Sequence, residues 1–139
     1  MMKQADKIKE VFFRENGDER GKLVAIEGLK DIPFEIKRIF YIYAASSDVI
    51  RGCHANRYSE FILINICGSS KVKVNDGMTE KIFILDKPCK GIYIPNMVWK
   101  EMYDFSPDSV LLAVTNKPYD AHEYIRNYKD YLKEVNNFE

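Results

Sequence analysis

Two histidines, His54 and His122, are the side chains of this sequence whose ordinary pKa lies nearest neutral pH. His54 stands in the run Arg51-Gly52-Cys53-His54-Ala55-Asn56. In an extended strand, residues 54 and 56 project from the same face, so an imidazole and an amide would share one environment. A lone strand histidine is most often a packed or surface residue. With Arg51 and Asn56 beside it, His54 indicates a polar cavity.

The remaining candidates for reactivity are weaker. Cys53, Cys67 and Cys89 form no CxxC pair, and their odd number favours reduced thiols in a cytoplasmic protein over a disulfide framework. Because free cysteines are usually buried, each is interpreted as a small core residue rather than a nucleophile. His122 is expected at the surface, in the first turn of a C-terminal helix.

The elements that must position these residues are mostly strands. Short runs rich in β-branched and aromatic residues alternate with turn residues, including Asn16-Gly17-Asp18 and Asn75-Asp76-Gly77. The runs predict strands at 10–14, 22–27, 36–43, 60–67, 71–75, 81–85, 91–94, 99–104 and 109–115. Residues 75–77 predict a hairpin in which Gly77 is free to take a positive φ. Many short, evenly spaced strands favour a sandwich or jelly roll over a parallel α/β sheet.

The C-terminal stretch changes to helical spacing. Apolar positions from Ala121 to Val135 recur at the helical period. Asp120 can cap this segment, and Glu123 follows three residues later as in a capping box. We therefore expect one amphipathic helix packed on the outside of an all-β domain.

Length and composition exclude several classes of protein. A chain of 139 residues, 46% of them hydrophobic, suits a single globular domain, and no linker or repeat divides residues 1–139. Its 21 basic and 21 acidic residues cancel, so no overall positive field recruits nucleic acid or an anionic membrane. Residues 1–10 lack the apolar core of a signal peptide, and no apolar run is long enough to span a bilayer. A cytoplasmic location is expected.

The surroundings of His54 resemble the first half-motif of the cupin family, a small jelly-roll β-barrel. In that family a His-x-His pair and a downstream Glu, here matched by His54, Asn56 and Glu60, face the barrel interior. The more specific resemblance is to cupin-type 3,4-ketoisomerases that act on dTDP-4-keto-6-deoxyglucose. Matching stretches occur in order along almost the whole chain, at 20–27, 32–42, 51–54, 91–94, 98–102, 104–106, 119–120 and 123–128.

The resemblance implies that the carbonyl of the sugar moves from C4 to C3 through an enediol. A neutral imidazole is a natural base for the C3 proton, and the resemblance gives that role to His54. Arg20 and Lys100 match positions near the sugar, where a donor or cation stabilises the enediolate. Arg20 favours the galacto, or fucose-type, configuration at C4 of the product.

The other implied site residues would bind the nucleotide and the sugar. Arg38, Arg51 and Arg126 could supply cations for the pyrophosphate. Aromatic or polar contacts would come from Tyr41, Tyr43, Tyr93 and Glu101, with some of the tyrosines serving only as packing.

Three departures from the family pattern bear on the chemistry. Asn56 replaces the second histidine, so a proton relay through that residue is absent. Lys100 occupies the position where metal-binding cupins have a further ligand, and an ammonium has no lone pair to give. His54 and one glutamate cannot hold a metal site, so we expect neither metal nor other cofactor. Phe40 also stands where a tyrosine often occurs.

Two other functions remain open from the sequence. One is a metal-free cupin 3,5-epimerase, and the other is a non-catalytic cupin that binds a nucleotide sugar, which Asn56 makes plausible. The strand predicted at 10–14, at the start of the chain, leaves N–H and C=O groups unpaired unless another strand covers them. A homodimer that exchanges this strand between subunits is expected, as in the enzymes that the chain resembles, and it would bring Arg20 close to the neighbouring active site.

Overall fold

The computed structural model describes residues 3–138, which form two facing five-stranded antiparallel sheets and a separate hairpin. The first sheet contains, in spatial order, β1 (Lys9–Phe12), β9 (Lys90–Ile94), β6 (Phe61–Cys67), β11 (Val110–Thr115) and β4 (Arg38–Tyr43). The second contains β12 (Tyr124–Ile125), β5 (Arg51–Asn56), β10 (Trp99–Tyr103), β7 (Ser70–Asn75) and β8 (Glu80–Leu85). This arrangement is a jelly roll whose two sheets have separate hydrogen-bonded ladders among the described residues.

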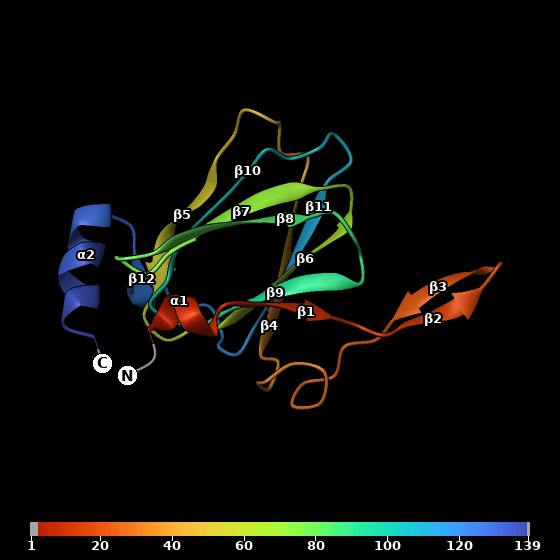
Figure 1. Cartoon of the computed structure of the whole chain (residues 1–139), viewed down its shortest axis with the longest axis horizontal. Coiled ribbons are helices and arrows are strands. Elements are labelled where there is room, and N and C mark those ends of the chain that lie inside the picture. Colours follow the sequence, from red (N-terminus) through yellow and green to blue (C-terminus); the bar gives the residue numbers. More distant parts are fainter. Residues whose placement is uncertain (1–2, 139) are drawn as a thin grey trace.

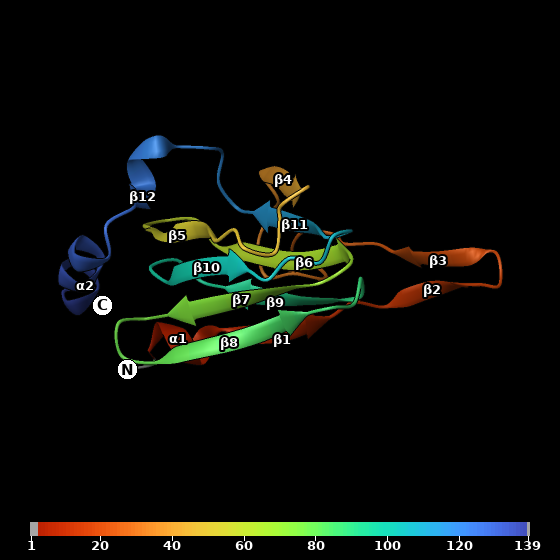
Figure 2. The same cartoon turned by 90° about the horizontal axis from the view of Figure 1, so that it is seen from above.

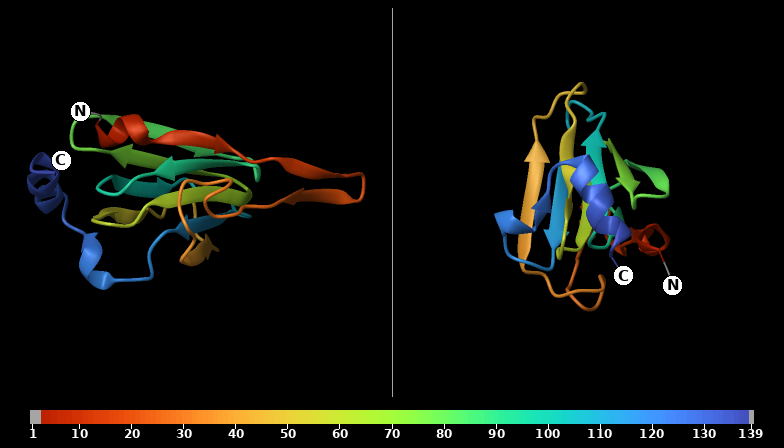
Figure 3. Two further views of the ribbon diagram at one scale, coloured as in Figure 1. Left: turned by 90° about the horizontal axis from the view of Figure 1, so that it is seen from below. Right: turned by 90° about the vertical axis from the view of Figure 1, so that its left-hand side faces the viewer.

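The remaining elements lie at the two ends of the sheets. β2 (Glu15–Asp18) and β3 (Gly21–Val24) form a hairpin that projects from one end, and α2 (Tyr128–Asn136) lies at the other (Figure 1 and Figure 2). Figure 3 shows α2 across the end of the strands, near α1 (Gln4–Lys7). The short 3-10 turn η1 (Ala121–Glu123) precedes β12.

The hydrophobic core fills the space between the two sheets. Alternate residues of β7, such as Val72 and Val74, point inward and are buried, which is the period of a half-buried strand. Phe61 and Leu63 of β6 belong to this core, while Ile62 and Ile64 pack into a second cluster on the other face of the first sheet. Because both faces of β6 are covered, residues 61–64 are a continuous apolar run rather than an alternating one.

The predicted strands are confirmed, with ends that shift by a few residues, except around the first hairpin. The sequence predicted a turn at residues 16–18, but these residues belong to β2, and the turn is formed by Glu19 and Arg20. Gly17 serves a close cross-strand approach, because a Cβ there would lie 2.0 Å from the carbonyl oxygen of Gly21. The hairpin at 75–77 is confirmed, and Gly77 has φ of 94°.

The predicted C-terminal helix is wrong over its first half. Tyr124 and Ile125 pair with Asn56 and Ala55 of β5 instead of continuing a helix. Burying Ile125 against Ala55 outweighs the helical pattern, as tertiary packing often does. The helix itself begins only after Asn127, whose side chain accepts the first capping bond from the Asp130 amide.

Predicted capping residues near the turn have different outcomes. Asp120 does cap the 3-10 turn, since its carboxylate accepts from the His122 amide at 2.9 Å. Glu123 forms no capping box, because its buried carboxylate is bound to Ser59 and to the amide of Tyr58. His122 is exposed, as expected.

Candidate active site

A β-bulge on β5 sets the position of His54. His54 pairs with Lys100 of β10 and Gly52 pairs with Glu101, so Cys53 has no partner in that ladder. Cys53 has φ of 56° and Gly52 has φ of 85°, a geometry that bends the strand locally. Bulges often occur beside active sites, where they redirect one side chain. Here the bulge turns the imidazole back over its own strand.

The hydrogen bonding of His54 identifies its basic nitrogen. Nδ1 lies 3.0 Å from the carbonyl oxygen of Gly52. A carbonyl only accepts, so Nδ1 carries the hydrogen and donates it, which leaves the Nε2 lone pair as the base. Burial, and after it the charge of Lys100, lower the pKa of His54 to about 4. The imidazole is therefore neutral at neutral pH.

Lys100 lies on the same inner face and is almost completely buried. Its Nζ donates to Oδ1 of Asn56 at 2.9 Å and lies 4.3 Å from the centre of the Phe61 ring. Burial lowers the pKa of Lys100 to about 7, although the charge of Glu123 acts in the opposite direction. An amide and an aromatic face thus hold an amine that titrates near neutrality.

Three buried polar atoms near His54 and Lys100 have no hydrogen-bond partner among the described residues. They are Nδ2 of Asn56, Nε of Arg38 and Oγ1 of Thr115. Arg38 and Thr115 are register partners on β4 and β11, and Phe61 of β6 is the partner of Thr115 on its other side. Leaving such an atom unpaired costs about 1–3 kcal/mol, so the three atoms mark where a polar ligand would bind.

The segment around β12 adds aromatic rings beside His54 and Arg38. The Tyr124 ring lies 4.8 Å from the His54 ring and 5.8 Å from that of Tyr119, centre to centre. The guanidinium of Arg38 lies over Tyr119 at 5.3 Å, and that of Arg126 lies over Tyr124 at 4.6 Å. A pocket of about 420 Å³ lies on the other side of this segment, lined by Tyr58, Lys117, Pro118, Tyr119, Asp120 and Glu123 and not by His54 or Lys100. We use the name inner pocket for a group of residues linked by these contacts: His54, Asn56, Lys100, Phe61, Thr115, Arg38 and Tyr124.

Most predicted polar residues gather at the inner pocket. His54, Asn56, Lys100 and Arg38 line it, and Arg126 reaches it through Tyr124. Arg51 is exposed, yet it pairs with Met102, a core residue, and therefore lies on the same face of the sheet as His54. Tyr119, Tyr124 and Thr115 were not among the predicted site residues, although the stretches that carry the family resemblance include the first two.

The structure places three predicted aromatic residues away from the inner pocket. Tyr41 and Tyr43 are exposed on the outer face of β4, opposite Arg38 and Phe40. Tyr93 packs in the cluster on the outer face of the first sheet, and its hydroxyl donates to Glu60. Burial and this carboxylate raise the pKa of Tyr93.

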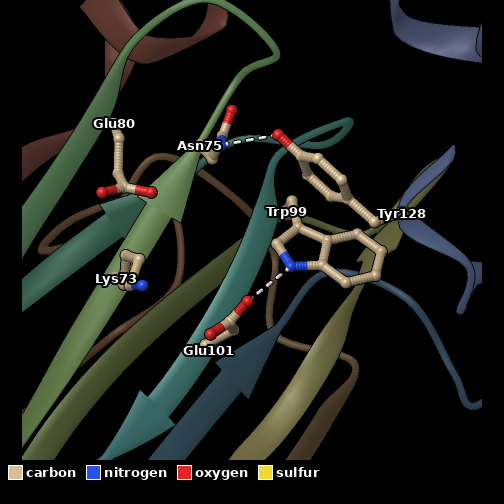
Figure 4. Close-up of a pocket in the computed structure, with 6 residues that line it drawn as sticks. All are labelled: Lys73, Asn75, Glu80, Trp99, Glu101 and Tyr128. Carbon is tan, nitrogen blue, oxygen red and sulfur yellow. Dashed lines mark hydrogen bonds between the residues drawn. The ribbon is translucent and has the colours of Figure 1, made fainter. Parts of the chain in front are cut away.

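Glu60 and Glu101 also lie outside the inner pocket. The Glu60 carboxylate accepts from Tyr93 and, at 2.8 Å, from Asn116, so it does not face His54 as the motif implied. Glu101 accepts from the Trp99 indole at 3.0 Å on the outer face of β10. There it lines a separate pocket of about 270 Å³ (Figure 4), whose other residues are Lys73, Asn75, Glu80, Trp99 and Tyr128. Neighbouring residues of a strand face opposite sides, which separates Glu101 from Lys100.

Arg20 lies at the tip of the β2–β3 hairpin, where its side chain is 86% exposed and paired with Asp18. Figure 2 shows this hairpin projecting from the sheets, away from β5, so the turn that carries Arg20 does not approach the strand that carries His54 in the same chain. The predicted burial of the cysteines is wrong for Cys53 and Cys67, which are exposed, while Cys89 is half-buried. Cys53 is the extra residue of the β-bulge, and its side chain is exposed for that reason.

Among residues 3–138, no three His, Cys, Asp or Glu side chains meet in an arrangement that could hold a metal ion. A metal-free site therefore stays a prediction from Asn56 and Lys100. None of the helices in the described part of the chain is long and apolar enough to cross a membrane.

Comparison with known proteins gives consistent matches. Residues 6–136 match the family described as "FdtA: WxcM-like, C-terminal". A TDP-4-oxo-6-deoxy-alpha-D-glucose-3,4-oxoisomerase from Aneurinibacillus thermoaerophilus is 40% identical over 131 residues, which cover 92% of this chain and 94% of the relative.

Solved structures agree with these matches. A mutant of the 3,4-ketoisomerase QdtA from Thermoanaerobacterium thermosaccharolyticum, in complex with TDP-4-keto-6-deoxyglucose, has a TM-score of 0.92 at 38% identity, covering 94% of this chain and 95% of that one. The TDP-fucose-3,4-ketoisomerase WlaRA from Campylobacter jejuni has a TM-score of 0.89 at 44% identity, covering 94% and 97%. The predicted all-β jelly-roll class and the family resemblance are confirmed.

Proposed function

This chain belongs to the FdtA, WxcM-like C-terminal family, and on that premise we propose that it is an isomerase that moves the keto group of dTDP-4-keto-6-deoxyglucose from C4 to C3. The observation that carries this proposal is a neutral His54 beside the buried Lys100, near buried polar atoms of Asn56, Arg38 and Thr115 that have no partner among the described residues. The product would be a dTDP-3-keto-6-deoxyhexose, a ketone suited to later conversion into a 3-amino sugar.

The geometry supports a proton transfer between neighbouring carbons. His54 Nε2 would remove the C3 proton, and the electrons of that bond would form the C3=C4 double bond of an enediol intermediate. The same nitrogen could return a proton at C4. Lys100 and Arg38 supply positive charge on the inner face, where the enediolate oxygens would develop negative charge.

The nucleotide half of the substrate is anionic and would need cations outside the reacting centre. Arg51 and Arg126 lie exposed near the inner pocket, and Arg38 lies within it. Guanidinium groups bind phosphate oxygens through paired N–H donors. We assign the pyrophosphate to these three arginines, with Tyr119 and Tyr124 as aromatic surface for the sugar or base.

An isotope experiment tests the proposed reaction directly. The protein is incubated with dTDP-4-keto-6-deoxyglucose in deuterium oxide, and the product is analysed by NMR. Isomerisation predicts solvent deuterium at C4 of a 3-keto product, and the Arg20 position predicts the galacto configuration there. Label at C3 and C5 without a carbonyl shift would identify a 3,5-epimerase instead. Bound sugar without any label would identify a binding protein.

We propose that the active form is a homodimer. Among residues 3–138, β2 and β3 pair only with each other, and a two-stranded hairpin is marginally stable alone. Its Leu23 side chain is exposed, as is that of Phe12 on the preceding strand. β1 pairs with β9 in the single chain. An exchange of this strand between subunits would keep the same pairs and bring Arg20 to the partner's site.

Light scattering on the intact chain should give about twice 16.3 kDa at micromolar concentration. Deletion of residues 1–14 should weaken both the dimer and catalysis. Leu23→Asp, which changes an exposed side chain, should weaken the dimer without unfolding the subunit. A fully active monomeric protein would show that each site is built from one chain.

A further inference from the structure

The environment of Lys100 is unusual for a lysine. Its side chain is 2% exposed, and none of the ion pairs among the described residues includes it. The single hydrogen bond of Nζ goes to a neutral amide oxygen, that of Asn56. A buried ammonium is normally paired with a carboxylate, because removing its charge from water is costly. A lysine kept without such a partner is suited to losing its proton.

The charged and titratable groups around this site come from several elements. His54 of β5 is the register partner of Lys100, and Arg126, which follows β12, lies close enough to His54 to lower its pKa. Arg38 of β4 lies over Phe40 and Tyr119 on the inner face. Glu123 of η1 is the one acidic group among them. Its carboxylate is already bound by Ser59 and by two backbone amides, which leaves it as a distant counter-charge rather than a hydrogen-bond partner.

The proposed reaction moves two hydrogens, and His54 accounts for only one. Between substrate and product, hydrogen leaves carbon C3 and arrives at carbon C4. At the same time the C3 hydroxyl becomes a ketone and the C4 ketone becomes a hydroxyl, so a second proton must pass from O3 to O4. The group that moves it has to donate to one oxygen and accept from the neighbouring one. Neither an arginine, which stays protonated, nor an amide can do both.

We propose that Lys100 carries the oxygen-bound proton of the 3,4-ketoisomerase reaction, while His54 carries the carbon-bound one; this inference rests on the proposed function. In the first half, His54 removes the C3 proton, the C–H pair forms the C3=C4 bond, and O4 takes a proton from the Lys100 ammonium. In the second half, the neutral amine removes the O3 proton, the C3=O bond forms, and C4 takes the proton from His54. Both groups return to their starting states, and no oxidant or cofactor is needed.

The acid–base properties of the pair agree with this division of roles. The pKa of Lys100, about 7, lets both the ammonium and the amine form during one turnover near neutral pH. The pKa of His54, about 4, keeps the imidazole basic over the same range. Asn56 suits this arrangement, because its amide orients Nζ without adding a charge that would fix the proton on lysine.

The test compares the intact enzyme with Lys100→Arg, which keeps a cation but cannot accept a proton. In the wild type, kcat/KM should rise as pH passes about 4 and fall above about 7. In Lys100→Arg, isomerisation should drop by roughly a hundredfold and the fall above pH 7 should disappear. Exchange of the C3 hydrogen with deuterium oxide should continue, because His54 is intact and a cation still stabilises the enolate.

The matched control is Lys73→Arg, on the outer face of the same sheet, which should leave the rate and pH profile unchanged. Normal isomerisation by Lys100→Arg, or a persistent fall above pH 7 in that variant, would overturn the proposal. Loss of C3 exchange together with isomerisation would also overturn it, because Lys100 would then serve the carbon step. Absence of both activities in the wild type would instead refute the proposed function.

Discussion

Replacing His54 by asparagine is expected to lower kcat by at least about a hundredfold, the usual size of a lost general base. Asparagine has a similar polar character and can still donate to the Gly52 carbonyl, but its amide cannot take the C3 proton. Turnover is measured by NMR of the keto-sugar product. Because the pyrophosphate is assigned to arginines, the affinity for dTDP, measured by calorimetry, should stay within a few-fold of wild type.

His122→Asn is the matched control, since it makes the same change in an exposed turn. It should leave both turnover and dTDP affinity unaltered. Near-normal turnover in the His54 variant would remove His54 from the role of base. Loss of turnover accompanied by an equal loss of dTDP binding would mean that the imidazole holds substrate instead of moving its proton.

The second large effect is expected on stability, at Glu123. Its carboxylate accepts from the amides of Tyr58 and Ser59 at 3.2 and 2.8 Å and from the Ser59 hydroxyl at 2.6 Å. In Glu123→Leu, these buried donors lose their acceptor, and each unsatisfied group costs about 1–3 kcal/mol. We expect the free energy of unfolding, measured in urea, to fall by roughly 3 kcal/mol or more.

Glu123→Gln keeps one acceptor oxygen in the same place, so it should lose clearly less stability than Glu123→Leu. A leucine variant within about 1 kcal/mol of wild type would show that the donors find water or another acceptor, and that the carboxylate does not hold the turn in place. In that event the position of Tyr124 beside His54 would need another explanation.

The strands could be predicted from the sequence because their signal is local. β7 and β8 combine alternating apolar residues with an Asn-Asp-Gly turn, and both follow directly from the chain. The hairpin of β2 and β3 could not be placed, because Asn16-Gly17-Asp18 has turn composition while Gly17 is required by the close approach of Gly21. Composition does not distinguish these two reasons for a glycine.

The site was predictable only where its residues lie near one motif. His54 and Asn56 alternate on one strand, and Lys100 pairs with His54, so pattern and resemblance converge on them. Tyr124 was assigned to the predicted C-terminal helix. Its strand, β12, has only two residues, which are too few to show the alternation of a strand. Tyr41 and Arg38 lie on opposite faces of β4, with Tyr41 exposed and Arg38 turned inward. The composition of an edge strand does not indicate which of its faces is buried, so this difference could not be predicted.

The buried amine of Lys100 also affects how the protein can evolve. Burial lowers the pKa of Lys100 from 10.5 to about 7. Keeping its ammonium charged in the folded state therefore costs a few kcal/mol relative to the unfolded chain. A domain of this size has only about 5–15 kcal/mol of net stability. An apolar residue at position 100 would remove that burden while removing the proton carrier. Selection for a durable fold and selection for turnover therefore act in opposite directions at this single position.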